Sequence, residues 1–294
     1  MNSTIKGFIL KSTKCLPDRL YLKMMYKIVT GERLNLENPT TFNEKLQWLK
    51  LNYRKPEFTN MVDKYEVREY ITKRVGEGYL IPVLGIWDTP EEINFDELPN
   101  QYVLKCTHDC EGLSICTDKT IFDTEAAKAK LKGCLKRNFY YQGREWPYKN
   151  VHPRIIAEQY MHDDGDDQLT DYKVFCFNGE PKIIQVDYDR FKGHKRQFYD
   201  VEWNRMDVSF HFPSDTTKRI PKPSVLGDML ELARKLSTGF PHLRTDFYII
   251  GDKIYIGEMT FYHGTGMGKW TPQSFDKEMG SWIELPKPTG GGNT

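Results

Sequence analysis

The chain has 294 residues, with 42 lysines and arginines against 41 aspartates and glutamates, so its formal net charge is only +1. A nearly neutral chain has no excess of positive charge to attract a polyanion, and we expect no nucleic-acid partner. The 39% hydrophobic content supports a folded core, and no apolar run approaches the roughly 20 residues of a membrane span. With no export signal in the sequence, the six cysteines are expected to be reduced thiols in the cytoplasm.

The N-terminal section, residues 1–78, is predicted to be helical. Apolar residues recur at helical spacing over 4–30 and 41–75, and Thr41 with Glu44 matches a capping box. The first of these segments is basic. It is either a solvated helix face or a face that attracts an anionic membrane surface or a glycosyltransferase partner.

From residue 79 the pattern changes to strands and turns. Segments 154–161 and 171–177 are apolar and β-prone, and an Asn-Gly turn then leads into a further strand. Amphipathic spacing predicts helices over 124–137 and 225–238. The glycine-rich residues 287–294 are predicted to form a flexible tail.

A group of cysteine and histidine residues, Cys106, His108, Cys110 and Cys116, raises the question of a zinc site. The spacing lacks the short Cys-x-x-Cys unit of zinc knuckles, and no second ligand pair follows. We therefore expect Cys106 and Cys116 to pack as small apolar residues on neighbouring strands.

The segment 243–260 is the most informative part of the chain. Two β-prone runs flank a Gly-Asp turn, which predicts a hairpin that brings Asp246 and Glu258 together. Two carboxylates and the hydroxyl of Thr260 are the hard oxygen ligands that Mg²⁺ accepts, and Arg244 can neutralise phosphate charge on the same surface. An ordinary amphipathic hairpin explains the same spacing, so the hairpin alone does not decide between a site and a plain strand pair.

Two lysines stand at positions from which they can reach a phosphate. Lys105 ends a strand-like run before the loop 107–114, and Lys173 lies inside the run 171–177. A loop of this kind can also cradle phosphates with its backbone N–H groups. Either lysine alone is explained as a solvent-facing strand residue, so their function depends on their order along the chain relative to the hairpin.

That order resembles the ATP-grasp superfamily over roughly residues 80–285. More closely, four segments are similar to the TupA-like ATP-grasp family, which is associated with teichuronopeptide and other bacterial surface-polysaccharide biosynthesis. They are GREWPYKNVHPRIIAEQYM, DYKVFCFNGEPKII, FYDVEWN and RTDFYIIGDKIYIGEMTFYHGTGM. The resemblance implies an α+β fold of two lobes, 79–157 and 158–286, which enclose a nucleotide cleft next to the helical section 1–78.

The resemblance also implies roles for individual residues. The ATP-binding residues would be Lys105, Gly112, Ser114, Glu158, Gln159, Tyr160 and Lys173. Asp246, Glu258 and Thr260 would bind Mg²⁺, and the catalytic residues would be Arg244, Lys173 and His263. Substrate contacts are expected from Arg144, Arg190 and Gly266. Thr260 departs from the family pattern, because many ATP-grasp enzymes have a metal-binding Asn there, and a second metal depends on it.

The activity that the resemblance implies is ATP- and Mg²⁺-dependent carboxylate–amine ligation through an acyl phosphate. Its most concrete form is amidation of a uronic-acid carboxylate of a surface polysaccharide by an amino acid. The reaction would take place in the cytoplasm or beside polysaccharide machinery on the inner face of the membrane. Two other functions remain open: a nucleotide- or glycan-binding accessory protein of a polysaccharide locus, and a kinase-like phosphotransferase acting on a sugar hydroxyl.

Overall fold

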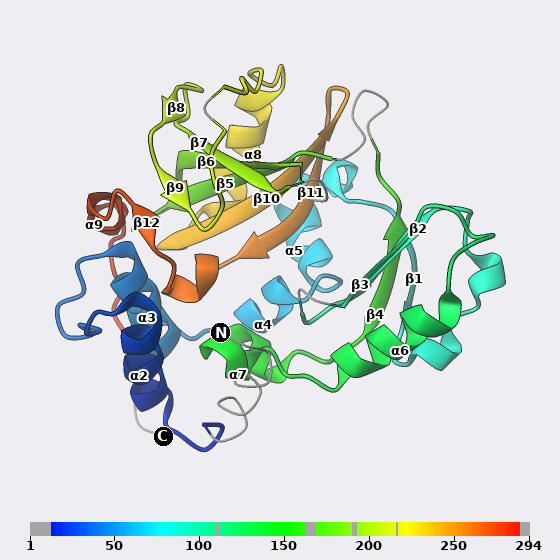
Figure 1. Ribbon diagram of the computed structural model, residues 1–294, viewed down its shortest axis with the longest axis horizontal. Helices are drawn as coiled ribbons and strands as arrows, with labels where there is room; N and C mark the ends of the chain where they lie inside the picture. Colours follow the sequence, from blue (N-terminus) through cyan, green and yellow to red (C-terminus); the bar gives the residue numbers. More distant parts are fainter. Residues whose placement is uncertain (1–12, 110–111, 163–168, 190–192, 216, 289–294) are drawn as a thin grey trace.

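The computed structural model describes residues 13–109, 112–162, 169–189, 193–215 and 217–288 (Figure 1). Its α-helices are α2 (Asp18–Thr30), α3 (Phe42–Asn52), α4 (Glu57–Val62), α5 (Val67–Val75), α6 (Thr124–Leu135), α7 (Tyr140–Gly143), α8 (Leu226–Ser237) and α9 (Ser274–Ser281). Its strands are β1 (Val83–Trp87), β2 (Tyr102–Cys106), β3 (Leu113–Cys116), β4 (Ile155–Gln159), β5 (Asp171–Phe177), β6 (Glu180–Tyr188), β7 (Lys195–Tyr199), β8 (Arg205–Met206), β9 (Ser209–Phe210), β10 (His242–Ile250), β11 (Lys253–Thr260) and β12 (Trp270–Thr271). Among the described residues, no helix has both the length and the apolar character needed to cross a membrane.

The described N-terminal section is built from helices α2 to α5. The capping box at the start of α3 is confirmed: the Thr41 hydroxyl accepts from the Glu44 N–H at 3.2 Å, and Glu44 accepts from the Thr41 N–H at 3.1 Å. The helical region predicted over 41–75 is divided into α3, α4 and α5, and Pro56 with the loop around it separates α3 from α4. Residues 13–17 are not helical either, since α2 begins after Pro17.

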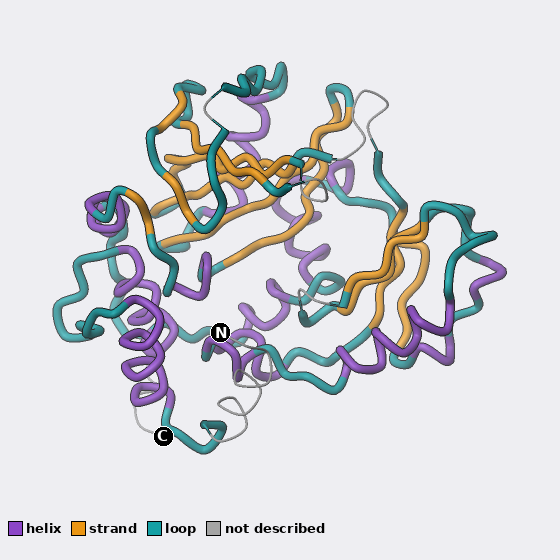
Figure 2. The backbone as a smooth tube through the Cα atoms, in the orientation of Figure 1, coloured by secondary structure: helices purple, strands orange, loops and turns teal. Residues whose placement is uncertain are grey.

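Two antiparallel sheets contain most of the strands, and Figure 2 shows them as separate groups of strands. The smaller sheet has the strand order β1-β4-β2-β3, and the larger one has the order β11-β10-β5-β6-β7-β8. β9 and β12 form a two-stranded pair beside them. Because β4 ends at Gln159, it crosses the expected lobe boundary between 157 and 158, and we propose that the boundary follows Gln159.

The larger sheet is covered on one face by α8 (Figure 1). Val174 and Cys176 point to this face, and the Ser237 hydroxyl at the end of α8 donates to the carbonyl of Gly179. The opposite face is apolar at one end only, where the Phe177 ring packs against Phe42 of α3. The other end of that face carries charged side chains.

The smaller sheet has a core of its own, formed with α6. Cys106 and Cys116 are buried in this core on neighbouring strands, which confirms the packing expected for them. Cys110 lies outside the described residues. Within the described part of the chain, no group of three or more His, Cys, Asp or Glu side chains is arranged to hold a metal ion.

Candidate functional site

A row of polar side chains crosses the larger sheet on the face opposite α8. Glu258 of β11 pairs with Asp246 of β10, Asp246 pairs with Lys173 of β5, and Lys173 pairs with Gln185 of β6. Directly opposed residues in neighbouring strands point to the same face, so the four side chains form one row. The pairing of β10 with β11 confirms the hairpin predicted from the sequence.

Asp246 is the centre of this row and is only 3% exposed. Its Oδ1 accepts from Arg244 Nε at 2.6 Å, and its Oδ2 accepts from Arg244 Nη2 at 2.8 Å and from Lys173 Nζ at 2.7 Å. Burial raises the pKa of the Asp246 carboxyl, but Arg244 and Lys173 lower it by more, so its pKa lies below the ordinary value. The carboxylate is therefore ionised at neutral pH and is paired with two cations.

Glu258 differs from its neighbour, because its side chain makes no hydrogen bond or ion pair with a described residue, although its charge helps to raise the pKa of Arg244. Thr260 lies two residues further along β11 and stands opposite Arg244, so it faces the same side of the sheet. Asp246, Glu258 and Thr260 thus present oxygen atoms on one surface. This donor set fits Mg²⁺, which is usually held by one or two carboxylates while phosphates and waters fill its other positions.

A second charged row lies two residues along β5 and β6 from the first row. Sequence reasoning did not identify it. It consists of Asp171, Asp187 and Arg196, which are opposed in register on β5, β6 and β7. Arg196 holds Asp187 with two bonds, from Nε to Oδ1 at 2.6 Å and from Nη2 to Oδ2 at 2.9 Å. Burial raises the pKa of Asp187, but Arg196 lowers it to about 2. The alternation of DYKVFCF, which puts Asp171 and Lys173 on one face, was the available signal.

Lys173 links the two rows. Its Nζ lies 2.7 Å from Asp246 Oδ2, 3.3 Å from Asp171 Oδ2 and 4.0 Å from Asp187 Oδ2. Burial lowers the pKa of this ammonium, but the three carboxylates raise it above its ordinary value. Lys173 is therefore a fixed positive charge within an acidic surface.

His263 lies behind Arg244, in the short 3₁₀ helix η5 (His263–Gly266). Its Nδ1 is 2.8 Å from Arg244 Nη1, and because a guanidinium can only donate, Nδ1 accepts and the proton is on Nε2. Burial and then Arg244 lower the pKa of the imidazole well below its ordinary value. The ring is neutral and packs against Phe175 and Phe210, so the geometry favours positioning of Arg244 over proton transfer.

The other expected nucleotide contacts belong to the smaller sheet. Lys105 of β2 and Glu158 of β4 are diagonal neighbours on one face, and Lys105 Nζ lies 2.5 Å from Glu158 Oε2. Gln159 is exposed at the end of β4, and Tyr160 follows it. The structure thus brings Lys105 and Glu158 together on one sheet, and Lys173, Arg244 and Asp246 together on the other.

Ser114 and Gly112 flank Leu113, the residue paired with Lys105. Ser114 is opposite Leu104, whose side chain is in the core beneath the sheet, so Ser114 points to the face away from Lys105. This placement does not support the expected contact of Ser114 with ATP. The sequence alone does not reveal the strand register, so it could not show which face Ser114 occupies. Gly112 has a packing role, since a Cβ there would lie 2.6 Å from the Sγ of Cys106.

Arg144 is buried and only 1% exposed. Its Nη2 donates to the Thr13 carbonyl at 2.7 Å, and its guanidinium lies over the ring of Tyr21 at 4.4 Å. It therefore holds the segment before α2 onto the protein, and the expectation that it contacts substrate is not supported.

The two remaining expected substrate contacts have different positions. Gly266 is buried against α3, where its carbonyl accepts from Gln47 Nε2 at 2.6 Å and a Cβ would lie 2.5 Å from the same nitrogen. Arg190 lies outside the described residues.

A buried lysine under η5, with a buried carboxyl nearby, was also missed. Lys50 of α3 is fully buried, and its Nζ donates to the carbonyls of Gly143 and Thr265, each at 2.7 Å. Burial lowers the pKa of Lys50, and burial raises the pKa of the nearby Glu145 carboxyl. Because the charge of Glu258 also raises the pKa of Glu145, this pair adjoins the β10–β11 hairpin. No sequence spacing indicates a contact between residues so far apart.

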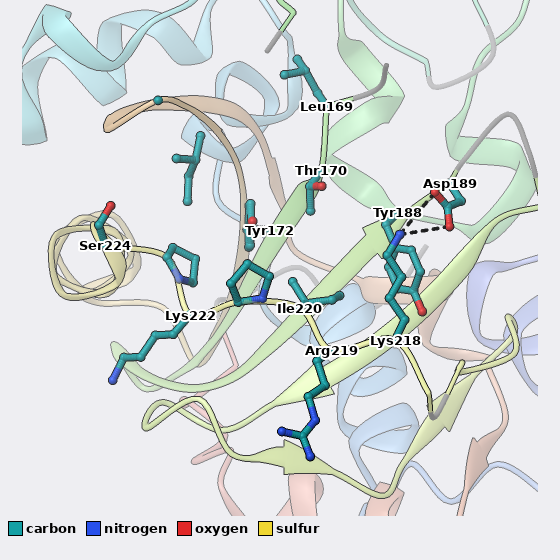
Figure 3. A pocket seen from close by; sticks show the side chains of 14 residues that line it. Leu169, Thr170, Tyr172, Tyr188, Asp189, Lys218, Arg219, Ile220, Lys222 and Ser224 are labelled. Atoms are coloured by element: carbon teal, nitrogen blue, oxygen red, sulfur yellow. Dashed lines mark hydrogen bonds and ion pairs between the residues drawn. The ribbon is translucent and has the colours of Figure 1, made fainter. Parts of the chain in front are cut away.

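A pocket of about 300 Å³ lies at one end of the larger sheet, on the α8 side (Figure 3). Tyr172 and Tyr188 line it, and they alternate along their strands with the residues of the two charged rows. Lys218 points to Asp189, with 3.3 Å between Nζ and Oδ2, whereas the Arg219 side chain extends away from the pocket in Figure 3. This pocket is therefore separate from the polar surface.

Comparison with protein families gives one match: the model for TupA-like ATP-grasp proteins covers residues 44–284. No curated protein matches the chain significantly. Among solved structures, D-alanine–D-alanine ligase from Bacillus anthracis complexed with ATP is 12% identical (TM-score 0.40), with 69% of this chain and 54% of that one covered. The Helicobacter pylori D-alanine–D-alanine ligase is 12% identical (TM-score 0.39), with 76% and 63% covered.

N5-carboxyaminoimidazole synthase from Aspergillus clavatus, in complex with ADP and an aminoimidazole ribonucleotide, is 14% identical (TM-score 0.40), with 70% of this chain and 46% of that one covered. The chain therefore spans between about half and two thirds of the length of these structures. Their likeness is too weak to carry a statement about activity, and the family match stands on the sequence.

Proposed function

Because the chain belongs to the TupA-like ATP-grasp family and has the ATP-grasp fold, we propose that it is an ATP- and Mg²⁺-dependent carboxylate–amine ligase. One observation carries this proposal. Asp246 is paired with the cations Arg244 and Lys173, while Glu258 stands directly opposite it without an ion pair of its own. An amphipathic hairpin needs only apolar residues on its buried face, so this concentration of buried charge is unexplained without a ligand.

In the proposal, Asp246, Glu258 and the Thr260 hydroxyl would hold Mg²⁺, which would supply charge neutralisation for the phosphates. Arg244 and Lys173, which pair with Asp246 in this structure, would direct donors to phosphate oxygens and to the charge that develops during phosphoryl transfer. His263 holds Arg244 in the required orientation through the bond to Nη1.

The nucleotide lies, in the proposal, between the two sheets. Lys105 approaches the phosphates, and Glu158 exchanges its ion pair with Lys105 for a hydrogen bond from a ribose hydroxyl. Gln159 and Tyr160 contact the adenine, and Gly112 lets the loop after β2 fold back closely. Lys105 is 22% exposed in its side chain, so a phosphate can reach it.

The reaction has two steps. A carboxylate oxygen of the substrate attacks the γ-phosphorus, the bond from that phosphorus to the β,γ-bridging oxygen breaks, and ADP leaves. The amine then attacks the acyl carbon, the bond to the phosphate oxygen breaks, and the amine loses a proton as the amide forms. These steps need positioning and charge neutralisation, which Arg244 and Lys173 provide, and no protein nucleophile.

The finer part of the proposal concerns the substrates. The family resemblance supports a uronic-acid carboxylate of a bacterial surface polysaccharide as acceptor and an amino acid as amine. Gly266 of η5 and Arg190 stay proposed substrate contacts. The reaction would take place in the cytoplasm or on the inner face of the membrane.

The deciding experiment measures thermal stabilisation by ATP with and without Mg²⁺, followed by ADP formation with uronic acids, uronate oligosaccharides and amino acids. We expect Mg²⁺-dependent stabilisation in the wild type and its loss in Glu258→Gln. Asp252→Asn is the matched control, because Asp252 is an exposed carboxylate at the tip of the same hairpin. No Mg²⁺-dependent effect of ATP would overturn the proposal, and a product that retains phosphate stably would show a phosphotransferase instead.

A further inference from the structure

Helix α2 presents a row of apolar side chains to solvent at the edge of the molecule (Figure 1). In this apolar row Leu20 is 54% exposed, Ile28 is 56% exposed, and Met24 between them is partly exposed. The described residues include seven exposed large hydrophobic side chains, and three of them, Leu20, Ile28 and Val29, belong to α2. Single exposed apolar residues are normal, but a concentration on one helix indicates a contact with a partner.

A cationic row runs beside the apolar row and has the same four-residue spacing. It consists of Arg19, Lys23 and Lys27, all of them exposed. Residues four apart lie on the same face of a helix, so the two rows are adjacent over about 12 Å. Asp18, the one acidic residue of α2, forms an ion pair with Arg54, with 2.7 Å between Oδ2 and Nη2. The charge on the outer face of α2 is therefore positive.

The inner face of α2 fixes the helix to the rest of the protein. Its buried residues are Tyr21, Leu22, Met25 and Tyr26. They form one apolar cluster with Met267, the residue after η5, and the Tyr21 hydroxyl donates to the Gln142 carbonyl at 3.0 Å. The helix is thus already folded and anchored, and its outer face presents both rows in a fixed geometry.

A partner of this face has to satisfy both rows at once. A solvated helix face needs polar residues at its exposed positions, and Leu20 and Ile28 are not polar. A bilayer that contains anionic lipids offers negative headgroups to the cations and an apolar interior to the side chains beside them. Lysine and arginine can keep their charged ends among the headgroups while their aliphatic stems lie along the apolar row. The charge and the apolar character together favour a lipid surface.

We propose that the outer face of α2 binds the surface of an anionic lipid bilayer. The helix lies parallel to the membrane, the apolar row inserts between the headgroups, and the cationic row pairs with lipid phosphates. This surface is distinct from the proposed nucleotide site, and its binding does not depend on ligase activity. It would hold the protein at a membrane as a peripheral protein.

The test is co-sedimentation of the full chain with lipid vesicles, without nucleotide or metal. One set of vesicles is phosphatidylcholine alone, and the other contains about one third phosphatidylglycerol, both at about 0.1 M salt. We expect partitioning to the anionic vesicles to be at least about tenfold stronger, and this gain should shrink at about 0.5 M salt because the attraction is screened. Equal partitioning to both sets of vesicles would overturn the proposal.

Two double variants locate the binding on α2. Arg19→Glu with Lys23→Glu reverses two charges of the cationic row and should weaken partitioning at least about tenfold. Leu20→Gln with Ile28→Gln removes two exposed apolar side chains and should weaken it about tenfold while keeping its salt dependence. Lys27 is left in place, because its Nζ also donates to the Gly31 carbonyl at the end of the helix. Undiminished partitioning of both variants would overturn the assignment to α2.

Matched controls change similar residues elsewhere on the surface. Arg219→Glu with Lys222→Glu reverses two exposed charges in the segment before α8, which lies away from α2 in Figure 1. Ile121→Gln removes an apolar side chain that is 82% exposed. Glu258→Gln separates lipid binding from the proposed nucleotide site. All three should partition like the wild type, and a loss as large as that of the α2 variants would overturn the assignment.

Light scattering of the full chain without vesicles tests for a second copy of the chain as the partner. A wild-type dimer that separates into monomers in Leu20→Gln with Ile28→Gln would show that a second copy covers the apolar row, and it would overturn the proposal. An oligomeric state that this variant leaves unchanged supports the proposal.

Discussion

Asp246 and Glu258 stand opposite each other across β10 and β11, yet the structure ties only Asp246 to cations. Replacing Asp246 by Asn leaves Arg244 and Lys173 buried without their main counter-charge. We expect Asp246→Asn to lower the free energy of unfolding by about 3–5 kcal/mol, as is usual when one partner of a buried ion pair is removed. Urea denaturation measures this, and a loss below about 1 kcal/mol would show that the charges relax without Asp246.

In contrast to Asp246→Asn, Glu258→Gln should have little effect on the free energy of unfolding. The Glu258 side chain makes no hydrogen bond or ion pair with a described residue and acts on Arg244 and Glu145 only through its charge, so its replacement should change the free energy of unfolding by no more than about 0.5–1 kcal/mol. The same variant should abolish the Mg²⁺-dependent part of the thermal stabilisation by ATP. A variant that unfolds like Asp246→Asn would instead give Glu258 a structural role.

The Asp187–Arg196 pair predicts a specific dependence of stability on pH. The native pKa of Asp187 is about 2, whereas an unfolded Asp has a pKa of about 3.9. The pair therefore contributes its full stability above about pH 4, and this contribution, roughly 2 kcal/mol, is lost as the pH falls through about 2. The measurement is the difference in unfolding free energy between wild type and Asp187→Asn from pH 5 to pH 2. The difference should shrink as the pH falls, and a constant difference would contradict the native pKa.

Arg144→Met should destabilise the protein without altering the nucleotide site. The substitution removes the bond to the Thr13 carbonyl and leaves a buried region without its guanidinium, at a cost of about 2–4 kcal/mol. Hydrogen exchange should increase first in residues 13–18. ATP affinity of the folded protein should match that of the wild type, and a selective loss of substrate turnover without destabilisation would restore Arg144 as a substrate contact.

Lys105→Met should weaken ATP binding about tenfold, because a charge-assisted bond to phosphate is worth about 1.5 kcal/mol or more. Lys132→Met is the matched control, since Lys132 forms an ion pair of similar length, 2.6 Å, with Glu91 on the exposed surface. Equilibrium binding of ATP is the readout. If both variants weaken ATP binding equally, the loss of affinity comes from the change in net charge and not from a contact between Lys105 and ATP.

Local patterns predicted the parts of the fold that are set by neighbours in sequence. The hairpin of Asp246 and Glu258 followed from two alternating runs around a Gly-Asp turn, and the start of α3 followed from Thr41 and Glu44. Both depend on residues within one turn or one strand pair. Their geometry is therefore determined by short segments, and it can be predicted without knowing the rest of the chain.

Contacts between distant segments could not be predicted in this way. Arg144 stands among aromatic residues, and that setting is equally typical of a buried anchor and of a substrate contact until burial is known. Ser114 was misplaced because the face of a strand depends on its register with its neighbour. The pairing of Lys50 with carbonyls of α7 and η5 has no local signal at all.

The contact of Lys50 with these carbonyls determines whether the N-terminal helices can be removed from the rest of the protein. Lys50 ties α3 to Gly143 and Thr265, so the early helices and the turn after the metal-binding hairpin share one buried charge. Truncation before residue 53 would leave the carbonyls of Gly143 and Thr265 without this donor and expose the apolar surface beneath α3. The helical section therefore folds together with the two lobes as one cooperative unit, and the two lobes are not expected to fold without it.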